Sequence, residues 1–212
     1  MIKFLFQGDS ITDATRVDVD DGGSGSNLFG YGYPLLFASD FLKNRKGEIE
    51  FINRGVSGDR IVDLYARIKD DIINLKPDAM SILIGVNDVW HELSQQNGVA
   101  ADKFEKIYDM LISEIKEALP DIKIIILAPF VLNGTGTQMY YDEFRCEVAK
   151  RAEAAERIAQ KHSLYFIPLQ ERFDDACSDG DTTYWATDGV HPAPAGHQLI
   201  KEALAEVVNK IL

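Results

Sequence analysis

Ser10, Asp188 and His191 have side chains suited to nucleophilic catalysis, and their positions suit acyl transfer. Ser10 ends the sequence Gly-Asp-Ser directly after an apolar run, while Asp188 precedes His191 by three residues. A serine hydroxyl is a poor nucleophile until a base removes its proton, and a histidine base needs a third group to hold its tautomer. A bend at Gly189 would let the Asp188 carboxylate reach Nδ1 of His191 and leave Nε2 for the serine. We therefore predict that these three residues form a catalytic triad.

Gly58 and Asn87 could complete the site by stabilising the oxyanion that acyl transfer forms. Such an intermediate needs hydrogen-bond donors aimed at it, and one donor is typically worth ~3 kcal/mol. The candidate donors are the backbone N–H groups of Ser10 and Gly58 and the side-chain amide of Asn87, and a glycine leaves room for substrate. Structural interpretations exist for both residues: Gly58 as a turn glycine before a helix, and Asn87 as an Asx turn that ends a strand. The interpretations are compatible, because a turn can hold a donor in place.

Short apolar runs alternate with longer helical patterns along the chain. The expected strands are Lys3–Gln7, Ile49–Asn53, Ala79–Ile84, Lys123–Ala128 and Leu164–Ile167. The expected helices are Tyr33–Lys43, Asp59–Leu75, Asp102–Leu119, Tyr141–His162 and Ala195–Leu212. Apolar strands without alternation are typical of a parallel sheet that is covered by helices on both faces. We therefore predict a flavodoxin-like three-layer α/β/α sandwich with a five-stranded parallel sheet, formed by one domain over residues 1–212.

This fold would bring the candidate residues together. Ligands of open α/β sheets bind at the carboxyl ends of strands. Ser10, Gly58 and Asn87 each follow one of the first three expected strands, so they should meet at one edge of the sheet. Alone, the acid–base pair near the end of the chain fits a helix cap beside an ordinary loop histidine. In combination with the three converging segments, the pair favours catalysis.

Four sequence blocks resemble those of the SGNH (GDSL-type) hydrolase superfamily. They are Gly8-Asp9-Ser10, Gly58, Gly85-x-Asn87-Asp88 and Asp188-x-x-His191-Pro192, in the family's order and over nearly the whole chain. The resemblance implies a triad of Ser10, Asp188 and His191. It also implies an oxyanion hole formed by the Ser10 amide, the Gly58 amide and the Asn87 side chain. Isoleucine follows the serine in place of the leucine of the family name, a conservative exchange that affects no catalytic group.

Segments around the site resemble more narrowly the intracellular xylan and xylo-oligosaccharide acetylesterases. They are Gly85–Trp90 and Tyr184–Pro192, the latter followed by Ala195-Gly196-His197. This resemblance implies a serine esterase that removes acetyl groups from such sugars through an acyl-serine intermediate. Trp90 and Trp185 could stack on sugar rings, although core or interface roles fit each tryptophan equally well. Asp9, which also suits stabilisation of the turn, is a further candidate for substrate contact, and Asn133–Tyr141 is expected to line the sugar side.

The composition restricts the partners. The chain of 212 residues has a formal net charge of −12, and an acidic surface repels phosphate backbones and anionic lipid. Neither nucleic acid nor a membrane is therefore expected as a partner. Cys146 and Cys177 lack neighbours at metal-ligand spacing and are interpreted as reduced thiols. With no leader or spanning segment recognised, we predict a cytoplasmic protein that uses no cofactor or metal and acts on a small acylated carbohydrate. The sequence leaves a homo-oligomer open.

Two alternative functions remain open from the sequence. An acyl thioesterase or lysophospholipase would use the same triad with a longer acyl pocket, whereas a non-catalytic carbohydrate-binding domain would not need a complete triad. No apolar insertion is long enough to form a lipase lid, which favours a short acyl group. The glycine-rich run Gly22–Ser26 is expected to form a mobile loop beside the site.

Overall fold

Five parallel strands form one sheet in the computed structural model, which describes residues 1–178 and 180–212. The strands are β1 (Ile2–Gly8), β2 (Ile49–Asn53), β3 (Ala79–Leu83), β4 (Lys123–Leu127) and β5 (Tyr165–Ile167). Their order across the sheet is β2-β1-β3-β4-β5, and every neighbouring pair is parallel. The order reverses between β1 and β3, which is where ligands bind in flavodoxin-like sheets. The predicted fold is thus confirmed, and the single domain over residues 1–212 stays a prediction.

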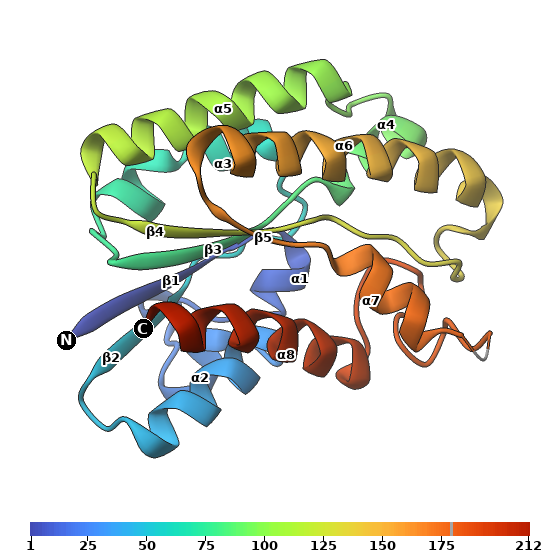
Figure 1. Cartoon of the computed structure of the whole chain (residues 1–212). Coiled ribbons are helices and arrows are strands. Elements are labelled where there is room, and N and C mark those ends of the chain that lie inside the picture. The colour runs from blue at the N-terminus through green and yellow to red at the C-terminus, as the bar shows by residue number, and fades with distance from the viewer. Residues whose placement is uncertain (179) are drawn as a thin grey trace.

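Helices cover both faces of the sheet (Figure 1). They are α1 (Ser10–Asp13), α2 (Tyr33–Asn44), α3 (Ile61–Ala66), α4 (Val86–Gln95), α5 (Ala101–Ala118), α6 (Tyr141–His162), α7 (Leu169–Ala176) and α8 (Pro194–Ile211). In Figure 1, α3, α5 and α6 lie on one face, and α2 and α8 lie on the other. None of the described helices is long and apolar enough to cross a bilayer.

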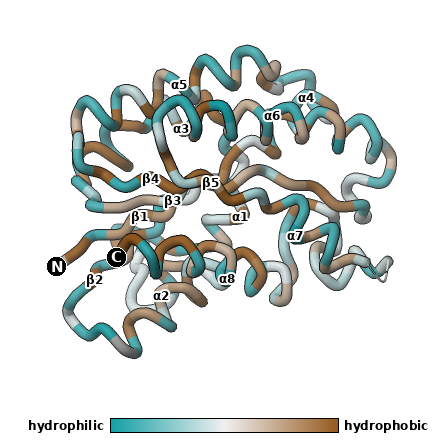
Figure 2. The backbone as a smooth tube through the Cα atoms, viewed as in Figure 1, coloured by the Kyte–Doolittle hydropathy of each residue, from teal (hydrophilic) through white to brown (hydrophobic). Residues whose placement is uncertain are grey.

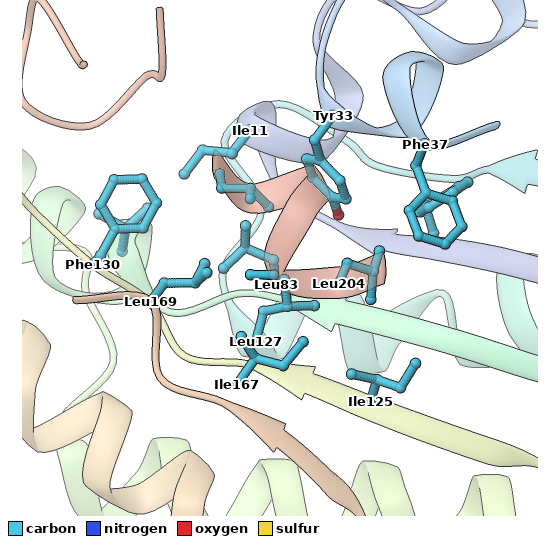
Figure 3. Close-up of a cluster of buried hydrophobic side chains, with 14 of the residues drawn as sticks. Ile11, Tyr33, Phe37, Leu83, Ile125, Leu127, Phe130, Ile167, Leu169 and Leu204 are labelled. Carbon is cyan, nitrogen blue, oxygen red and sulfur yellow. The ribbon is translucent and has the colours of Figure 1, made fainter. Parts of the chain in front are cut away.

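The unbroken apolar runs of the strands follow from this double coverage. In β1, Phe4 and Phe6 pack into the core on the side of α2 and α8, whereas Leu5 between them packs on the side of α3 and α5. Figure 3 shows the first of these cores, in which Tyr33 of α2 and Leu204 of α8 face the strands. Hydrophobic backbone segments accordingly lie toward the sheet, and hydrophilic segments lie on the outer sides of the helices (Figure 2).

The segment after β2 differs from the single helix expected over Asp59–Leu75. It forms the short helix α3, which begins after Arg60, and then a π-helical segment, Lys69–Ile73. Asp59 does not cap the helix, because its N–H donates to the Val56 carbonyl (3.2 Å) and its carboxylate pairs with the Arg67 side chain. An aspartate before an apolar run fits a cap or an ion pair equally well, and only the fold supplies the partner.

Three helices, α1, α4 and α7, are absent from the expected elements. Helix α4 begins directly after Gly85, whose φ of +127° ends β3 in a conformation that favours glycine. Asn87 therefore lies in the first turn of a helix and not in an Asx turn. The helix is short and amphipathic, with Val86 and Val89 buried, so its pattern is hard to separate from that of a strand end.

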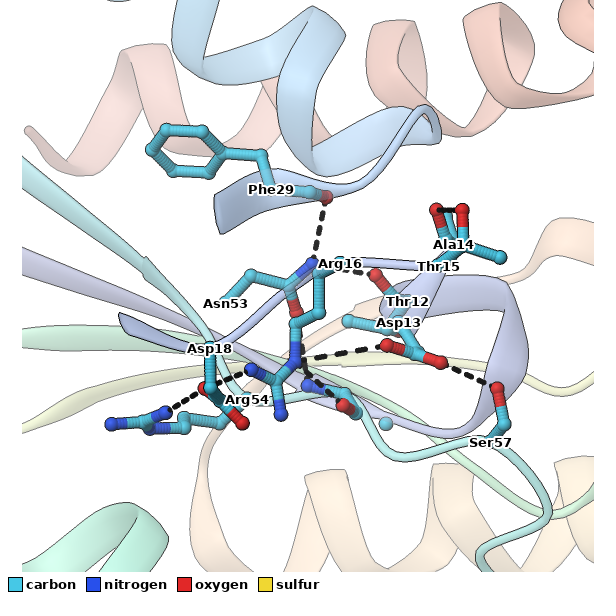
Figure 4. Close-up of polar contacts among 12 residues, drawn as sticks. Thr12, Asp13, Ala14, Thr15, Arg16, Asp18, Phe29, Asn53, Arg54 and Ser57 are labelled. Carbon is cyan, nitrogen blue, oxygen red and sulfur yellow. Dashed lines mark hydrogen bonds and ion pairs between the residues drawn. The ribbon is translucent and has the colours of Figure 1, made fainter. Parts of the chain in front are cut away.

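Polar contacts attach the segment between α1 and α2 to the end of β2 (Figure 4). The Asn53 side chain donates to the Phe29 carbonyl (2.9 Å), and Arg54 pairs with Asp18 (2.6 Å). The run Gly22–Ser26 belongs to this segment, and residues on both sides of it line a groove along β2. The run was expected beside the site, but its surroundings are those of the sheet edge.

Candidate active site

Ser10, His191 and Asp188 form a hydrogen-bonded chain at the carboxyl end of the sheet. The Ser10 Oγ lies 2.8 Å from Nε2 of His191, and Nδ1 of His191 lies 2.6 Å from Oδ2 of Asp188. Ser10 begins α1 just after β1, whereas the other two residues lie in the turn before α8. The structure thus brings together, from opposite ends of the chain, the three residues predicted as a triad.

Hydrogen bonds within the turn from Asp188 to His191 fix its geometry. Oδ1 of Asp188 accepts hydrogen bonds from the backbone N–H groups of Val190 (2.9 Å) and His191 (2.8 Å), which leaves Oδ2 for the imidazole. Gly189 has a φ of +90°, and a Cβ there would lie 2.3 Å from the Leu132 carbonyl oxygen. The alternative in which Asp188 caps the last helix is wrong, because Ala193 occupies that position.

The electrostatics of the pair suit a histidine base. The hydrogen bond with Asp188 raises the pKa of His191 above its ordinary value of 6.5, while burial opposes the rise. Burial acts to raise the pKa of Asp188, but hydrogen bonds from His191 and from two backbone N–H groups outweigh it and lower that pKa. Asp188 therefore stays ionised at neutral pH and can stabilise a charged imidazolium.

Gly58 lies in a turn between β2 and α3. The Asp59 N–H donates to the Val56 carbonyl across the turn (3.2 Å), and Gly58 has a φ of +87°. A positive φ at the third position is typical of a type II turn, in which glycine is favoured. A Cβ on Gly58 would meet nothing within 4 Å. Glycine is thus required here by the backbone conformation, and the space in front of it is open.

Asn87 is oriented by the same turn. Its side-chain Nδ2 donates to the Asp59 carbonyl (3.1 Å), and the residue is 5% exposed. An amide nitrogen has two N–H groups, so one remains for a substrate oxygen. In the described part of the chain, the N–H groups of Ser10 and Gly58 have no protein acceptor. Three donors from three segments are therefore available to an oxyanion.

Two buried carboxyl groups shape the backbone beneath these donors. Asp9 is 1% exposed and caps α1, with its Oδ1 accepting from the Ile11 N–H (3.0 Å). This position gives Asp9 a role in the turn and does not favour the direct substrate contact considered for it. Asp88 is fully buried and accepts from the Ile61 N–H, which joins the start of α3 to α4. Burial raises the pKa of each carboxyl group to about 7.

The two tryptophans occupy different environments. The Trp90 ring centroid lies 5.8 Å from that of His191 and 6.1 Å from that of Phe144. Trp90 also lines a pocket of about 260 Å³ together with Leu93, Ser94, Thr135, Gly136, Gln138, Met139, Tyr140 and Phe144. Trp185 instead packs edge-on against Tyr184, while both tryptophans adjoin the hydrophobic core. Of the two, Trp90 is the one beside the imidazole.

The segment Asn133–Tyr141 connects this pocket to the acid–base pair. The Gly136 N–H donates to the Asp188 carbonyl (3.0 Å), and the Thr135 N–H donates to the Thr187 carbonyl (3.1 Å). Beyond these contacts, Met139 is 78% exposed and Tyr140 is 48% exposed. The segment is thus held by backbone atoms and by the buried Thr137 hydroxyl, which donates to the Leu132 carbonyl (2.7 Å), and it presents Met139 and Tyr140 outward. Among the described residues, no cluster of His, Cys, Asp or Glu could hold a metal ion.

A hydroxyl, an imidazole and a carboxylate in one hydrogen-bonded chain, together with N–H groups that could stabilise an oxyanion, form an arrangement suited to ester hydrolysis. Comparison with known proteins agrees with this chemistry. Residues 6–199 match the GDSL-like Lipase/Acylhydrolase family, and the chain belongs to that family. The protein is a carboxylic ester hydrolase.

Several proteins of known structure or described activity are similar to this chain. The chain is 33% identical to an acetylxylan esterase of Geobacillus stearothermophilus, in an alignment that covers 98% of this chain and 94% of the relative. A putative GDSL-like lipase from Parabacteroides merdae has a similar structure, with a TM-score of 0.90, 32% identity and coverage of 98% and 95%. Axe2, an acetylxylan esterase from Geobacillus stearothermophilus, superposes with a TM-score of 0.85, 31% identity and coverage of 97% and 93%.

Proposed function

We propose that this protein is a serine esterase that removes acetyl and other short acyl groups from carbohydrate esters such as acetylated xylo-oligosaccharides. The observation that carries the proposal is the hydrogen-bonded chain from Ser10 through His191 to Asp188. The substrate class is supported by the similarity to acetylxylan esterases over 98% of the chain. The cytoplasmic location, the absence of a cofactor and a possible oligomeric state stay predictions from the sequence.

The reaction would proceed in two half-reactions. Ser10 Oγ attacks the ester carbonyl carbon while Nε2 of His191 takes the hydroxyl proton, and Asp188 stabilises the resulting imidazolium. The carbon–oxygen bond to the sugar then breaks, and His191 returns the proton to the departing sugar oxygen. Water attacks the acyl-serine in the same way, with its proton passing through His191 to Ser10, and the carboxylic acid leaves.

The tetrahedral intermediates of both half-reactions would be stabilised by the same donors. These are the backbone N–H groups of Ser10 and Gly58 and the remaining amide N–H of Asn87. The three groups carry no other protein partner for these hydrogens among the described residues, so they are free to meet charge as it forms. Removing one such donor typically lowers kcat about 10²- to 10³-fold.

The sugar is best accommodated on the side of Trp90. Its ring is the partly exposed aromatic beside His191, and it borders the pocket that Gln138, Met139 and Tyr140 help to line. Aromatic faces pack well on sugar rings, and nearby polar groups can orient hydroxyls. Trp185 packs mainly on Tyr184, so we assign it a smaller share in substrate binding.

The proposal is tested by acetate release from acetylated xylo-oligosaccharides, measured beside hydrolysis of p-nitrophenyl acetate and p-nitrophenyl octanoate. The wild type should act on the oligosaccharide and on the acetate ester, and Ser10→Ala should lose both activities. Trp90→Ala should raise KM for the oligosaccharide more than KM for p-nitrophenyl acetate. Turnover that rises from acetate to octanoate, with none on the oligosaccharide, would instead indicate a thioesterase or lysophospholipase. Binding without turnover would indicate a carbohydrate-binding domain.

A further inference from the structure

Arg67 lies behind the candidate oxyanion site, at the end of α3, and the reaction outlined above does not use it. Its side chain is 16% exposed and is directed at the loops that follow β1 and β2. An arginine side chain carries five N–H donors in a rigid planar fork, so it can hold several acceptors in one fixed arrangement. The identity of its acceptors is therefore informative.

Four hydrogen bonds tie this guanidinium to the site. Nε donates to Oδ2 of Asp59 (2.7 Å), Nη1 donates to the Arg54 carbonyl (2.8 Å) and to Oδ2 of Asp71 (3.0 Å), and Nη2 lies 3.3 Å from the Gly8 carbonyl. Two of the four acceptors are main-chain carbonyls in the segments that carry the nucleophile and the Gly58 turn. The contacts thus do more than neutralise the two carboxylates.

Two of the four acceptors, Gly8 and Asp59, lie within two residues of a candidate oxyanion donor. Gly8 stands two residues before Ser10, and its carbonyl also accepts from the Val56 N–H (3.0 Å) at the start of the Gly58 turn. Asp59 closes that turn and directly follows Gly58, and its own carbonyl accepts from the Asn87 side chain (3.1 Å). The same guanidinium therefore contacts both sides of the interface between the β1 and β2 loops.

We propose that Arg67 is a positioning residue that sets the relative placement of the three oxyanion donors. This inference rests on the proposed function, since it concerns the same site. Oxyanion donors accelerate a reaction only when they are already arranged around the point where charge develops. A lysine at this position would keep the charge but offers a single nitrogen on a flexible stem, so it cannot hold the Gly8, Arg54 and Asp59 oxygens together.

A purely structural role predicts a different result from a positioning role. If Arg67 only stabilises the fold, its variants should unfold at lower temperature while the folded molecules keep their kcat. If it positions the donors, kcat should fall and KM should change little, because the oxyanion exists only in the transition state and the intermediates. The division between kcat and KM, measured on folded protein, distinguishes the two roles.

The experiment compares Arg67→Lys and Arg67→Met with Arg60→Met, using p-nitrophenyl acetate and thermal melting. Arg60 is a matched control because its side chain is 17% exposed and pairs with Asp63 at the start of the same helix. We expect kcat to fall about 10- to 100-fold in both Arg67 variants, with KM changed less than about threefold. Arg60→Met should keep kcat within about twofold. An Arg67→Lys protein with wild-type kcat, or one impaired only in KM, would overturn the inference.

A double-mutant cycle tests the link to Asn87. The effect of Arg67→Lys should be smaller in an Asn87→Ala background, because part of it passes through the Asp59 carbonyl to the missing amide. Fully additive losses would contradict that link. If Arg67→Lys does not fold, Asp59→Asn serves in its place, since it removes the charge from one acceptor and keeps the main-chain carbonyl. It should lower kcat in the same direction, and an unchanged kcat would count against the inference.

Hydrolysis of the same ester by the wild type, Ser10→Ala and Arg67→Lys distinguishes failure of this inference from failure of the proposed function. Ester hydrolysis that Ser10→Ala abolishes and Arg67→Lys leaves intact rejects the positioning role alone. A wild-type protein without esterase activity, or one in which Ser10→Ala is fully active, rejects the proposed function and the inference with it.

Discussion

The two halves of the candidate site are built in opposite ways. The acid–base half lies within the turn from Asp188 to His191, and three hydrogen bonds inside that turn set its geometry. The proposed oxyanion half would take its donors from Ser10, Gly58 and Asn87, which follow three different strands. A short peptide can encode the first half, whereas the second exists only once the sheet has formed.

Because of this difference, the two halves depend on different supporting contacts. The acid–base pair needs neighbours that hold the turn, such as the Leu132 N–H that donates to the Gly189 carbonyl (2.8 Å). The oxyanion half depends on buried polar side chains, namely Arg67 behind the Gly58 turn and Asp88 between α3 and α4. Substitutions in the first half should therefore act on proton transfer, and substitutions in the second should act on transition-state stabilisation.

Asp188→Asn should have the largest effect and would sharpen the contrast, because it alters only the local half. The amide keeps the shape of the carboxylate but favours the wrong imidazole tautomer, so kcat should fall about 10³- to 10⁴-fold. The matched control is Asp109→Asn, which removes a comparable contact to His162 (2.7 Å) between α5 and α6. The measurement is kcat for p-nitrophenyl acetate. A loss of less than tenfold, or an equal loss in Asp109→Asn, would contradict the assignment.

Gly58→Ala should have the next largest effect, of about 10²-fold in kcat, because a side chain disfavours the positive φ of this turn, and relaxation of that strain would turn its N–H away from the oxyanion. The backbone strain should cost only about 1 kcal/mol of stability, since the new methyl group meets no atom within 4 Å. Gly47→Ala is the control, because Gly47 also has a positive φ, of +78°, and equally open space. If Gly58→Ala and Gly47→Ala had equal kcat, the result would contradict the proposed role of the Gly58 N–H.

The smallest of the predicted effects is the change of kcat/KM with pH. Protonated His191 cannot accept the serine proton, and its raised pKa places the midpoint of the rising limb of kcat/KM above 6.5. Burial lowers the pKa of His197 to about 4, and burial and Arg60 lower that of His91, so neither can produce this limb.

Asp9 titrates in the same range as this limb, since burial raises its pKa to about 7. The profile is therefore also recorded for Asp9→Asn, which keeps an oxygen for the Ile11 N–H and removes the charge. The limb should persist and move to lower pH, because the negative charge of Asp9 helps to raise the pKa of His191. A limb that disappears in Asp9→Asn would assign the titration to Asp9 instead.

The sequence predicted the fold class, because apolar runs without alternation and an alternating order of elements define a covered parallel sheet. It also pointed to Ser10, Asp188 and His191, since side-chain type and spacing carry the chemistry directly. Arg67 was missed, and no local pattern marks it: an arginine in an amphipathic helix usually faces solvent. Three of its four partners come from the end of β1 and the loop after β2, so only the folded chain reveals these contacts.

Local sequence patterns also did not predict the helix boundaries around the site. Asp59 resembles a helix cap until the fold provides Arg67 as its partner and Val56 as the acceptor of its N–H. Asn87 resembles a turn residue until Gly85 redirects the chain into α4. In both cases the sequence identified the residue but not the element that holds it.

The attachment of the segment after β4 has a consequence for how substrate range can diversify. A Cβ on Gly134 would lie 2.2 Å from the Gly189 nitrogen, so this anchor tolerates little change. A few positions further on, Gln138, Met139 and Tyr140 border the pocket, and among the described residues their side chains form no hydrogen bond. Selection or laboratory evolution can therefore exchange these three residues to suit new sugars, while the peptide contacts that steady Asp188 are inherited unchanged.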